Sequence, residues 1–279
     1  MRLGALATGS GVPAQDFAGR IEEVHTRAGL LALDDGRLVT LITPEFGCEP
    51  RAITVDAAAG ISFRTIFVAG ADVAARGSVL RVAGGAIVVD LRRAKPWRSG
   101  LGLLQLDLRR TPVARAYGRA WSALEADGRD GGLRDIAGAP LDLLAKATRQ
   151  YDVTAAGRAA ARLIGAGEGR TPAGDDYLVG FLAALWASVG TSKSFAASLS
   201  TQLVVLAKRT ERLSRLYLEA VAECEVSERI VAVAAGIAAG RDDICIGFAA
   251  DAVLARGHSS GAATLLGLLQ GIASCAKMA

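Results

Sequence analysis

The chain has 279 residues, of which 51% are hydrophobic and 22% are charged. A chain of this length and composition can bury a sizeable core in one large domain or two modest ones, which excludes a peptide, a disulfide-stapled miniprotein and a disordered protein. Its 32 Lys and Arg residues against 28 Asp and Glu residues leave a formal net charge of +4. That charge is too small to indicate nucleic acid or an anionic membrane as a partner.

Cysteine usage and hydropathy indicate where the protein works. The four cysteines are far apart, and with two histidines in the chain they make no recognisable zinc framework. The apolar stretch from Leu178 to Val189 is about a dozen residues long, short of the roughly 20 that cross a bilayer. The first residues lack the long apolar segment of a secretory signal. We therefore expect a cytoplasmic protein with reduced thiols and no membrane association.

Short runs rich in Val, Ile, Leu and Thr, broken by Gly and Asp, fill the chain from Gly19 to about Arg110. They predict strands, among them the runs RAITVD and FRTIFVAG. Asp35-Gly36 predicts a hairpin turn between residues 30–33 and 38–42, because Gly readily adopts the positive φ of a type I′ turn. Gly84-Gly85 predicts a second hairpin between residues 79–82 and 87–91.

After about Thr111 the sequence becomes rich in Ala and Leu at helical spacing, which predicts helices for most of the remainder. The expected fold class is therefore α+β. A β-rich N-terminal part made of hairpins, for which a barrel-like sheet is one arrangement, precedes a mainly α-helical C-terminal part. We expect the two domains at residues 1–110 and 111–279, with surface loops at residues 127–132 and 191–194.

A glycine-rich loop precedes a predicted helix in the segment GAGEGRTPAGDDYLVGFLAALW, residues 165–186. Thr171 is predicted to cap this helix, with Pro172 in its first position. The spacing of one buried helix face is followed by Leu178, Phe181, Leu182, Leu185 and Trp186.

Two aspartates in the first turn of this helix are candidate functional residues. Asp175 falls on the apolar stripe, so we expect it to point inward, where a carboxylate is costly unless it is protonated, paired or coordinated. Asp176 lies about 100° around the helix, so the two carboxylates need not share a partner. Gly174 favours a functional role, because glycine weakens a first turn unless something approaches closely.

The loop before the helix is a candidate anion cradle. Gly165, Gly167 and Gly169 allow backbone NH groups to converge on a phosphate or carboxylate at the helix N-terminus. The Walker pattern with its lysine is missing, and no strand gives a Rossmann context. A flexible loop with dipole-compensating aspartates is an equally good interpretation.

A second motif, Gly257-His258-Ser259-Ser260-Gly261, fits the Gly-x-Ser-x-Gly elbow of α/β-hydrolases, with Ser259 as the nucleophile. The chain order disfavours a serine hydrolase, because no histidine follows the serine and the preceding segment is helical in pattern. An apolar stripe instead predicts a second helix, formed around Leu265, Leu268, Leu269 and Ile272.

We expect Ser259 or Ser260 to cap this second helix. If the two glycine-containing loops meet, they can hold both ends of a small dianion, with His258 donating to a carbonyl or phosphoryl oxygen. A serine cap beside a solvent-facing histidine is the plainer alternative.

Two basic segments give weaker signals. Residues 209–214, RTERLS, end a helix predicted from about Phe195, and their arginines and hydroxyls can reach an anion or form a solvated helix end. A second group of cations flanks Trp97 and can bind an acid, stack on a planar ligand or lie at a subunit interface; it consists of Arg92, Arg93, Lys95 and Arg98. Without a periodic basic face, nucleic-acid binding is not indicated.

Three segments, GRTPAGDDYLVGFL, RTERLS and GHSSGAATLLGLLQG, together resemble the signature segments of a bacterial family, the oxamate carbamoyltransferase subunits of allantoin catabolism, a purine degradation route. The Thr-Pro-x-Gly-Asp-Asp core is the specific part, and the similarity extends to the β-rich half ending near Trp97. The chain departs from the family pattern at Glu168, commonly glycine or proline, and at Arg170, commonly apolar.

The resemblance implies exchange of a carbamoyl group between carbamoyl phosphate and a small amide or acid such as oxamate, within an assembly of several subunits. We hypothesise that Asp175 and Asp176 act as base or metal ligands and that His258 polarises the carbamoyl oxygen. The remaining expected binding residues are Gly167, Gly169, Thr171, Gly174, Ser259, Ser260, Gly261, Thr210 and Trp97. No cofactor is required by the pattern, and Mg²⁺ is compatible with it. The alternative is a non-catalytic anion-binding or assembly subunit.

Overall fold

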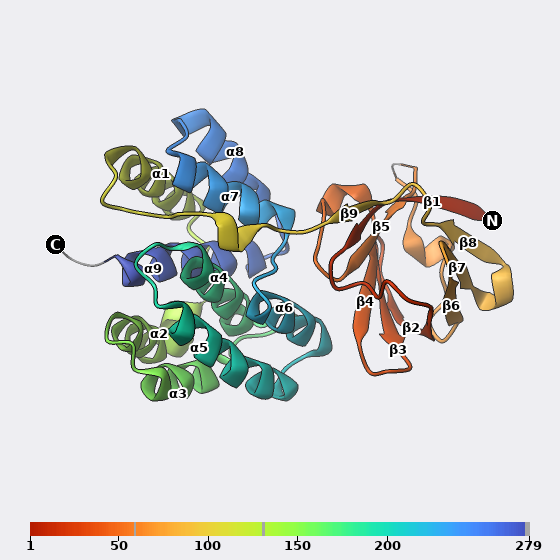
Figure 1. Ribbon diagram of the computed structural model, residues 1–279, viewed down its shortest axis with the longest axis horizontal. Helices are drawn as coiled ribbons and strands as arrows, with labels where there is room; N and C mark the ends of the chain where they lie inside the picture. Colours follow the sequence, from red (N-terminus) through yellow and green to blue (C-terminus); the bar gives the residue numbers. More distant parts are fainter. Residues whose placement is uncertain (59, 130–131, 277–279) are drawn as a thin grey trace. The chain divides into compact units, whose positions relative to one another are not determined.

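The computed structural model describes residues 1–58, 60–129 and 132–276. The chain forms two compact units, Met1–Ser99 and Gly100–Ala279 (Figure 1). The first unit consists of strands and the second of helices, so the α+β class with a β-rich N-terminal part is confirmed. The strands are β1 (Arg2–Gly9), β2 (Phe17–Val24), β3 (Ala28–Leu33), β4 (Leu38–Ile42), β5 (Ala52–Asp56), β6 (Asp72–Arg76), β7 (Val79–Val82), β8 (Ile87–Asp90) and β9 (Lys95–Trp97).

The strands close into a barrel. Their order is β5-β4-β3-β2-β6-β7-β8-β1-β9, and a further pairing of β1 with β5 joins the two sides of the sheet. Strand β1 runs antiparallel to β5 along one edge, while its other edge is parallel first to β8 and then to β9. The interior is filled by buried aliphatic side chains such as Ile21, Leu31, Leu41 and Ile53.

Both predicted hairpins are present. Strands β3 and β4 pair antiparallel, with Gly36 of the intervening turn at φ 84°. Strands β7 and β8 also pair antiparallel, with positive φ at Gly84 and Gly85. The strand predicted for FRTIFVAG is wrong. That segment forms a single turn of 3₁₀ helix, Phe63–Thr65, because a helical spacing of four buries both Phe63 and Phe67, whose rings meet edge to face at 5.0 Å.

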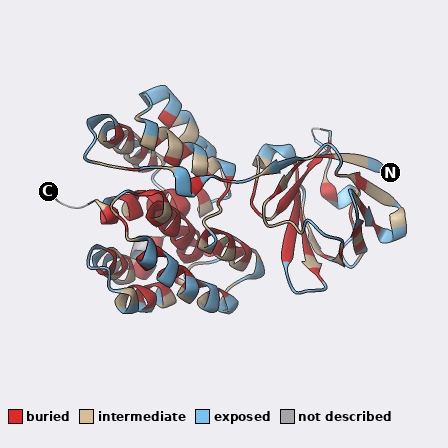
Figure 2. Ribbon diagram, in the orientation of Figure 1, coloured by how far each residue is buried: buried red, intermediate tan, exposed pale blue. Residues whose placement is uncertain are grey.

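Helices make up the second unit. The α-helices are α1 (Thr111–Asp127), α2 (Leu133–Arg149), α3 (Val153–Leu163), α4 (Ala173–Ala187), α5 (Lys193–Leu206), α6 (Arg212–Ala222), α7 (Glu228–Ala239), α8 (Asp243–Leu254) and α9 (Ser260–Cys275). Helices α4 and α9 lie in the middle of the unit with the others around them (Figure 1), and Figure 2 shows them as its most buried part.

Helix α4 is buried on almost every side, not along the single face predicted from its apolar spacing. Val179 and Ala183, outside the predicted stripe, are buried as well as Leu178 and Leu182 inside it. The reason is that α9, α5, α6 and α3 pack around it. The second predicted stripe, on α9, is likewise buried in full. A helix in this central position needs small residues wherever a neighbouring backbone comes close.

Glycines let α4 and α9 run side by side in the same direction. A Cβ atom on Gly267 would lie 2.0 Å from the carbonyl oxygen of Tyr177, and one on Gly271, further along α9, would lie 2.6 Å from the Cβ atom of Ala184, further along α4. Residue numbers therefore rise in the same direction along α4 and α9, so the two helices are parallel. This parallel arrangement brings the two helix starts to the same end of the unit.

The division between the units falls between Ser99 and Gly100, earlier than the boundary expected at residues 110 and 111. Leu101 and Leu106 already belong to the helical core, and Leu106 forms a bridge with Ser188 after α4. Of the two expected loops, residues 127–132 include residues 130 and 131, which lie outside the described part. Residues 191–194 are a loop only as far as Ser192, which caps α5.

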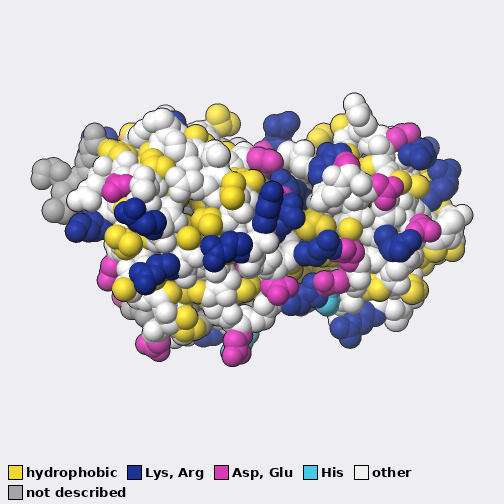
Figure 3. Space-filling view, turned by 90° about the horizontal axis from the view of Figure 1, so that it is seen from below, with side chains coloured by type: hydrophobic (Ala, Val, Ile, Leu, Met, Phe, Trp, Pro, Cys, Tyr) yellow, Lys and Arg dark blue, Asp and Glu magenta, His cyan; other side chains and the backbone are white. Residues whose placement is uncertain are grey.

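Within the described residues, none of the helices is both long and apolar enough to cross a membrane. Lys and Arg side chains are spread over the face drawn in Figure 3, with acidic and apolar side chains between them.

Candidate functional site

The starts of α4 and α9 meet directly. The hydroxyl oxygens of Thr171, just before α4, and Ser260, the first residue of α9, lie 2.8 Å apart and share a hydrogen bond. The two glycine-containing loops, which are far apart along the chain, are therefore neighbours in space. Their meeting point is part-buried, at the end of the unit toward which both helix N-termini point.

The cap predicted for α4 is wrong by one residue. Pro172 occupies the N-cap position and the helix begins at Ala173, while the Thr171 side chain turns to Ser260. The NH of Gly174 donates to the Ala166 carbonyl at 2.8 Å. A Cβ atom on Gly174 would lie 2.0 Å from the carbonyl oxygen of Leu163. The close approach expected at this glycine is therefore made by the end of α3.

Asp175 points inward as predicted and is 1% exposed. One carboxylate oxygen accepts from the Gly165 NH at 2.9 Å and the other from the Thr210 hydroxyl at 2.5 Å. Burial raises the pKa of Asp175, although these two hydrogen bonds act in the opposite direction. Both oxygens thus bind the loop after α3 to the segment before α6 (Arg212–Ala222).

Asp176 is 5% exposed, and its Oδ2 is buried with no hydrogen-bond partner among the described residues. Burial raises its pKa to about 7, against the lowering effects of the Arg256 charge and of the Ser260 and Thr171 hydroxyls. A buried polar oxygen without a partner is costly, which points to a proton or a ligand. Of the two carboxylates, Asp176 is the one with an oxygen left to act.

Among the described residues, the two aspartates share no hydrogen-bond partner, in agreement with their positions around the helix. Among the described residues, no three His, Cys, Asp or Glu side chains gather in a group that would hold a metal ion. Both oxygens of Asp175 already accept hydrogen bonds, so Oδ2 of Asp176 is the carboxylate oxygen that Mg²⁺ held together with a substrate phosphate would use.

The start of α9 also differs from its predicted capping. Ser259 occupies the N-cap position, yet its side chain makes no capping hydrogen bond, and Ser260 binds Thr171 instead. Gly261 packs against α8, where a Cβ atom would lie 2.0 Å from the Val253 carbonyl oxygen. Because helix α8 precedes the motif, Ser259 lacks the strand that a hydrolase elbow requires.

Two arginines that the sequence analysis did not single out hold the segment before α9. Arg129 donates to the carbonyl oxygens of His258 at 2.9 Å and Leu254 at 3.2 Å. The Arg256 guanidinium lies 4.4 Å from the ring centre of Tyr217, and its charge acts on Asp176. The His258 side chain is exposed. Arg256 stands next to the Gly-His-Ser-Ser-Gly motif, whereas no pattern marks Arg129.

The remaining predicted residues divide between the two units. Gly167 and Gly169 have positive φ, of 109° and 90°, in the loop before α4. The sequence predicted that the segment with Thr210 ends a helix from about Phe195, and this prediction is wrong. Helix α5 ends at Leu206, and Thr210 lies between a 3₁₀ turn and α6, where it reaches Asp175. Trp97 lies on β9 of the β unit, so its place in the site stays a prediction.

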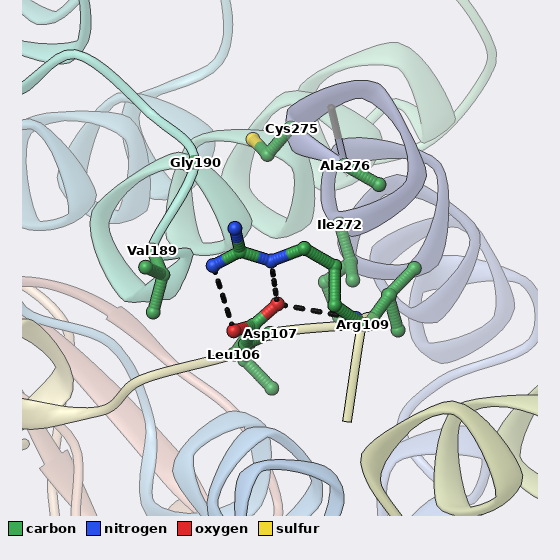
Figure 4. Close-up of a pocket in the computed structure, with 9 residues that line it drawn as sticks. Leu106, Asp107, Arg109, Val189, Gly190, Ile272, Cys275 and Ala276 are labelled. Atoms are coloured by element: carbon green, nitrogen blue, oxygen red, sulfur yellow. Dashed lines mark hydrogen bonds and ion pairs between the residues drawn. The ribbon is translucent and has the colours of Figure 1, made fainter. Parts of the chain in front are cut away.

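A separate hollow of about 150 Å³ lies beside the C-terminal end of α9 (Figure 4). The Asp107–Arg109 ion pair and Cys275 line it, and Figure 4 shows the Arg109 guanidinium held by Asp107. Thr191 donates to the Cys275 sulfur at 2.8 Å, and burial raises the pKa of this thiol. A protonated, buried thiol is a poor nucleophile, so this hollow offers less chemistry than the helix starts.

A family model described as oxamate carbamoyltransferase subunit AllH matches residues 163–272. This segment is AllH-like. It runs from the end of α3 into α9 and so contains Asp175, Asp176, Thr210 and the Ser259–Gly261 turn. The resemblance stated from the three motif segments is thereby confirmed, whereas its extension to the β-rich half stays a prediction, and the match supports a carbamoyltransferase-related subunit. The comparisons with curated proteins and with solved structures each find no match.

Proposed function

We propose that the chain is a subunit that takes part in carbamoyl transfer from carbamoyl phosphate to a small amide such as oxamate, at the meeting point of α4 and α9. The observation that carries the proposal is the buried Oδ2 of Asp176, which has no hydrogen-bond partner in the part of the chain that the structure describes, beside the Thr171–Ser260 hydrogen bond and within the AllH-like segment. The protein partners that we propose for the chain are other subunits of one assembly.

The chemistry asks for a base and a place for phosphate. The amide nitrogen attacks the carbamoyl carbon, a C–N bond forms, the bond from that carbon to the phosphate oxygen breaks, and the nitrogen loses a proton. Asp176, with a pKa of about 7, is suited to take that proton near neutral pH. Asp175 is the positioning residue, because both of its oxygens hold neighbouring segments.

The anion is proposed to lie at the paired helix starts. Two helix N-termini at one end of the unit favour negative charge there. Arg256, whose charge already acts on Asp176, adds a cation to the same place. His258, on the loop that Arg129 holds, is proposed to donate to the carbamoyl oxygen, with Gly167, Gly169, Ser259 and Gly261 supplying the surrounding backbone.

The test is carbamoyl transfer by the complete purified assembly carrying single variants of this chain. Asp176→Asn is expected to lower kcat by about 100-fold or more, with a smaller change in KM, because removal of a general base acts on the transition state. His258→Ala is expected to lower kcat by a smaller factor. A matched control is Val205→Ala on α5, an exposed position with 64% accessibility. Unchanged turnover in both site variants contradicts the proposal.

The second candidate is an anion-binding or assembly subunit without catalysis. It is favoured by Asp175, whose 1% exposure and two internal hydrogen bonds give it a role inside the fold. Thermal denaturation of the chain with carbamoyl phosphate, phosphate, oxamate and oxalurate separates the candidates. Stabilisation that survives Asp176→Asn, together with full turnover of the assembly carrying that variant, selects the second candidate.

A further inference from the structure

A second hollow, of about 290 Å³, lies between the C-terminal ends of α2 and α9. Cys275 and Ala276 border both this hollow and the smaller one drawn in Figure 4. Its volume is near the lower end of the roughly 300–1,000 Å³ that is typical of small-molecule sites. The first residue of α9, Ser260, and its last residue, Cys275, are roughly 22 Å apart at about 1.5 Å per residue. The hollow is therefore separate from the meeting point of the two helix starts.

The end of α2 gives the hollow a cation and a buried hydroxyl group. Arg149, the last residue of α2, is exposed and forms no ion pair within the described residues. The nearby Asp152 carboxylate accepts the Ala155 NH at 2.9 Å as the cap of α3. Thr148 is 2% exposed, and its Oγ1 has no hydrogen-bond partner in the part of the chain that the structure describes. A buried hydroxyl without a partner is costly, which points to a polar group that enters the hollow.

The rest of the polar lining accepts hydrogen bonds. Three hydroxyl groups, those of Tyr151, Thr191 and Ser274, each donate their hydrogen to another group of the protein. Their oxygens therefore offer lone pairs to a ligand. The C-terminal ends of α2 and α9 add partial negative charge, because the helix dipole is negative at that end. This lining suits a ligand group that is cationic and carries several N–H donors.

Tyr151 is a fixed wall of the hollow. Its φ of 54° lies in the left-handed region, which residues other than glycine seldom adopt. Its hydroxyl donates to the Gly190 carbonyl oxygen at 2.6 Å, and its ring meets that of Phe195 edge to face at 5.8 Å. Backbone strain of this kind persists where neighbouring groups hold the residue, and it is frequent at ligand sites. The wall is thus in place before a ligand arrives.

We propose that this hollow binds a small amino acid, whose carboxylate contacts Arg149 and Thr148 and whose ammonium group contacts the oxygens of Tyr151, Thr191 and Ser274. A guanidinium group offers paired N–H donors that match a carboxylate. An ammonium group has three N–H donors and no acceptor, which matches three oxygens whose own hydrogens are engaged. Because the hollow is at the other end of α9, this site does not depend on the function proposed above.

The first test is calorimetric titration of the full chain with glycine and with L-alanine. Two analogues of glycine each replace one charged group by methyl: propionate lacks the ammonium group, and ethylamine lacks the carboxylate. Glycine is expected to bind, and each analogue is expected to bind at least tenfold more weakly. Absence of binding by both amino acids, or equal binding of glycine and propionate, overturns the proposal.

The second test locates the ligand with variants. Arg149→Gln is expected to weaken glycine binding by tenfold or more, whereas Arg158→Gln on α3, also at an exposed arginine, is the control and is expected to keep the wild-type affinity. Asp176→Asn, at the helix starts, is expected to keep it too, so this proposal and the proposed function fail or hold separately. Unchanged affinity in Arg149→Gln means that glycine binds elsewhere, which contradicts the site.

Thr148→Val separates a role in binding from a role in the fold. Valine keeps the shape of threonine but lacks the hydroxyl, so glycine binding is expected to weaken by tenfold or more. The melting temperature of the chain without ligand is expected to stay at or above the wild-type value, because the hydroxyl has no partner there among the described residues. A lower melting temperature with unchanged glycine affinity counts against the site.

The third test uses a chain that ends at Ala276, which borders the hollow. This shortened chain is expected to bind glycine as tightly as the full chain. Binding by the shortened chain alone means that the hollow does not receive a ligand in the full protein, and the proposal is then wrong. A crystal of the full chain soaked in glycine is expected to show the ligand between Arg149 and Ser274.

Discussion

The hydroxyl groups of Thr171 and Ser260 are hydrogen-bonded at 2.8 Å across 89 positions of sequence. The bond joins the starts of two parallel helices, whose dipoles place partial positive charge side by side. Asp175 and Asp176, both in the first turn of α4, place their carboxyl groups there. In their ionised form they offset the repulsion between the two positive helix ends, as well as supplying the site.

The close packing of α4 and α9 is expected to tolerate no side chain at Gly267. Gly267→Ala would place a Cβ 2.0 Å from the Tyr177 carbonyl oxygen, so the two helix backbones must separate. We expect a loss of roughly 3 kcal/mol or more in the free energy of unfolding, measured by urea denaturation. Gly118→Ala on α1 has open space around its Cβ and is expected to gain about 0.5–1 kcal/mol. Equal effects at both positions contradict the packing.

Asp176 is expected to make stability depend on pH. Its pKa of about 7 in the folded state exceeds the ordinary 3.8, so the folded chain holds the proton more tightly than the unfolded chain does. The resulting stabilisation is full below 3.8 and is lost as pH rises to 7, at about 1.4 kcal/mol per pH unit.

Asp176→Asn is accordingly expected to remove this slope and to be more stable than the wild type at pH 8. Urea denaturation at pH 5, 6, 7 and 8 measures the difference. The exposed Asp251→Asn is the control and is expected to keep the wild-type slope. If the free energies of unfolding of Asp176→Asn and the wild type change in parallel with pH, the buried carboxyl of Asp176 does not hold its proton as expected.

The hydrogen bond from Thr210 to Asp175 is expected to support both the fold and the ionised form of the acid. Thr210→Val keeps the shape but removes the donor, which costs about 1.5–3 kcal/mol for a bond to a charged group. The pKa of Asp175 should rise further, since this bond lowers it. Thr210→Ser retains the hydroxyl and should stay near the wild type. Thermal denaturation near neutral pH compares the three chains. Equal stability of the Val and Ser variants would contradict a stabilising role of the hydrogen bond from Thr210 to Asp175.

Arg129 is expected to keep the turn before α9 in place. Arg129→Leu removes the donors to the His258 and Leu254 carbonyl oxygens, so the amide of Gly261, which donates to the Arg256 carbonyl at 3.0 Å, should exchange its hydrogen faster. Hydrogen exchange followed by mass spectrometry measures this segment. Arg158→Leu on α3, at an exposed arginine, serves as the control and should leave the exchange unchanged.

Features that rest on local chemistry were predictable from the sequence. The Asp35-Gly36 turn and the inward direction of Asp175 follow from positive φ and from helical spacing, and both are observed. Features decided by distant partners were not. Thr171 fails to cap α4 because Ser260 takes its hydroxyl, and the FRTIFVAG run is not a strand because Phe63 and Phe67 fill the barrel interior together.

The same distinction explains what the sequence missed in the site. The meeting of the two loops was a hypothesis from the sequence and is observed, but it depends on glycines at helix crossings, which the local pattern of one segment does not reveal. Arg129 acts through its contacts with a turn 125 to 129 residues further along the chain. The unpartnered oxygen of Asp176 becomes evident only once the surrounding helices are in place.

Strand β1 gives the barrel an order of assembly. Its neighbours β5, β8 and β9 all follow it, the last ending at Trp97, so the opening strand has to wait for nearly the whole unit before it can close the ring. Contacts so distant in sequence slow folding, and until closure the edges of β5 and β8 stay open to pairing with other molecules. During synthesis on the ribosome, this first unit is therefore most exposed to misassembly just before β9 emerges.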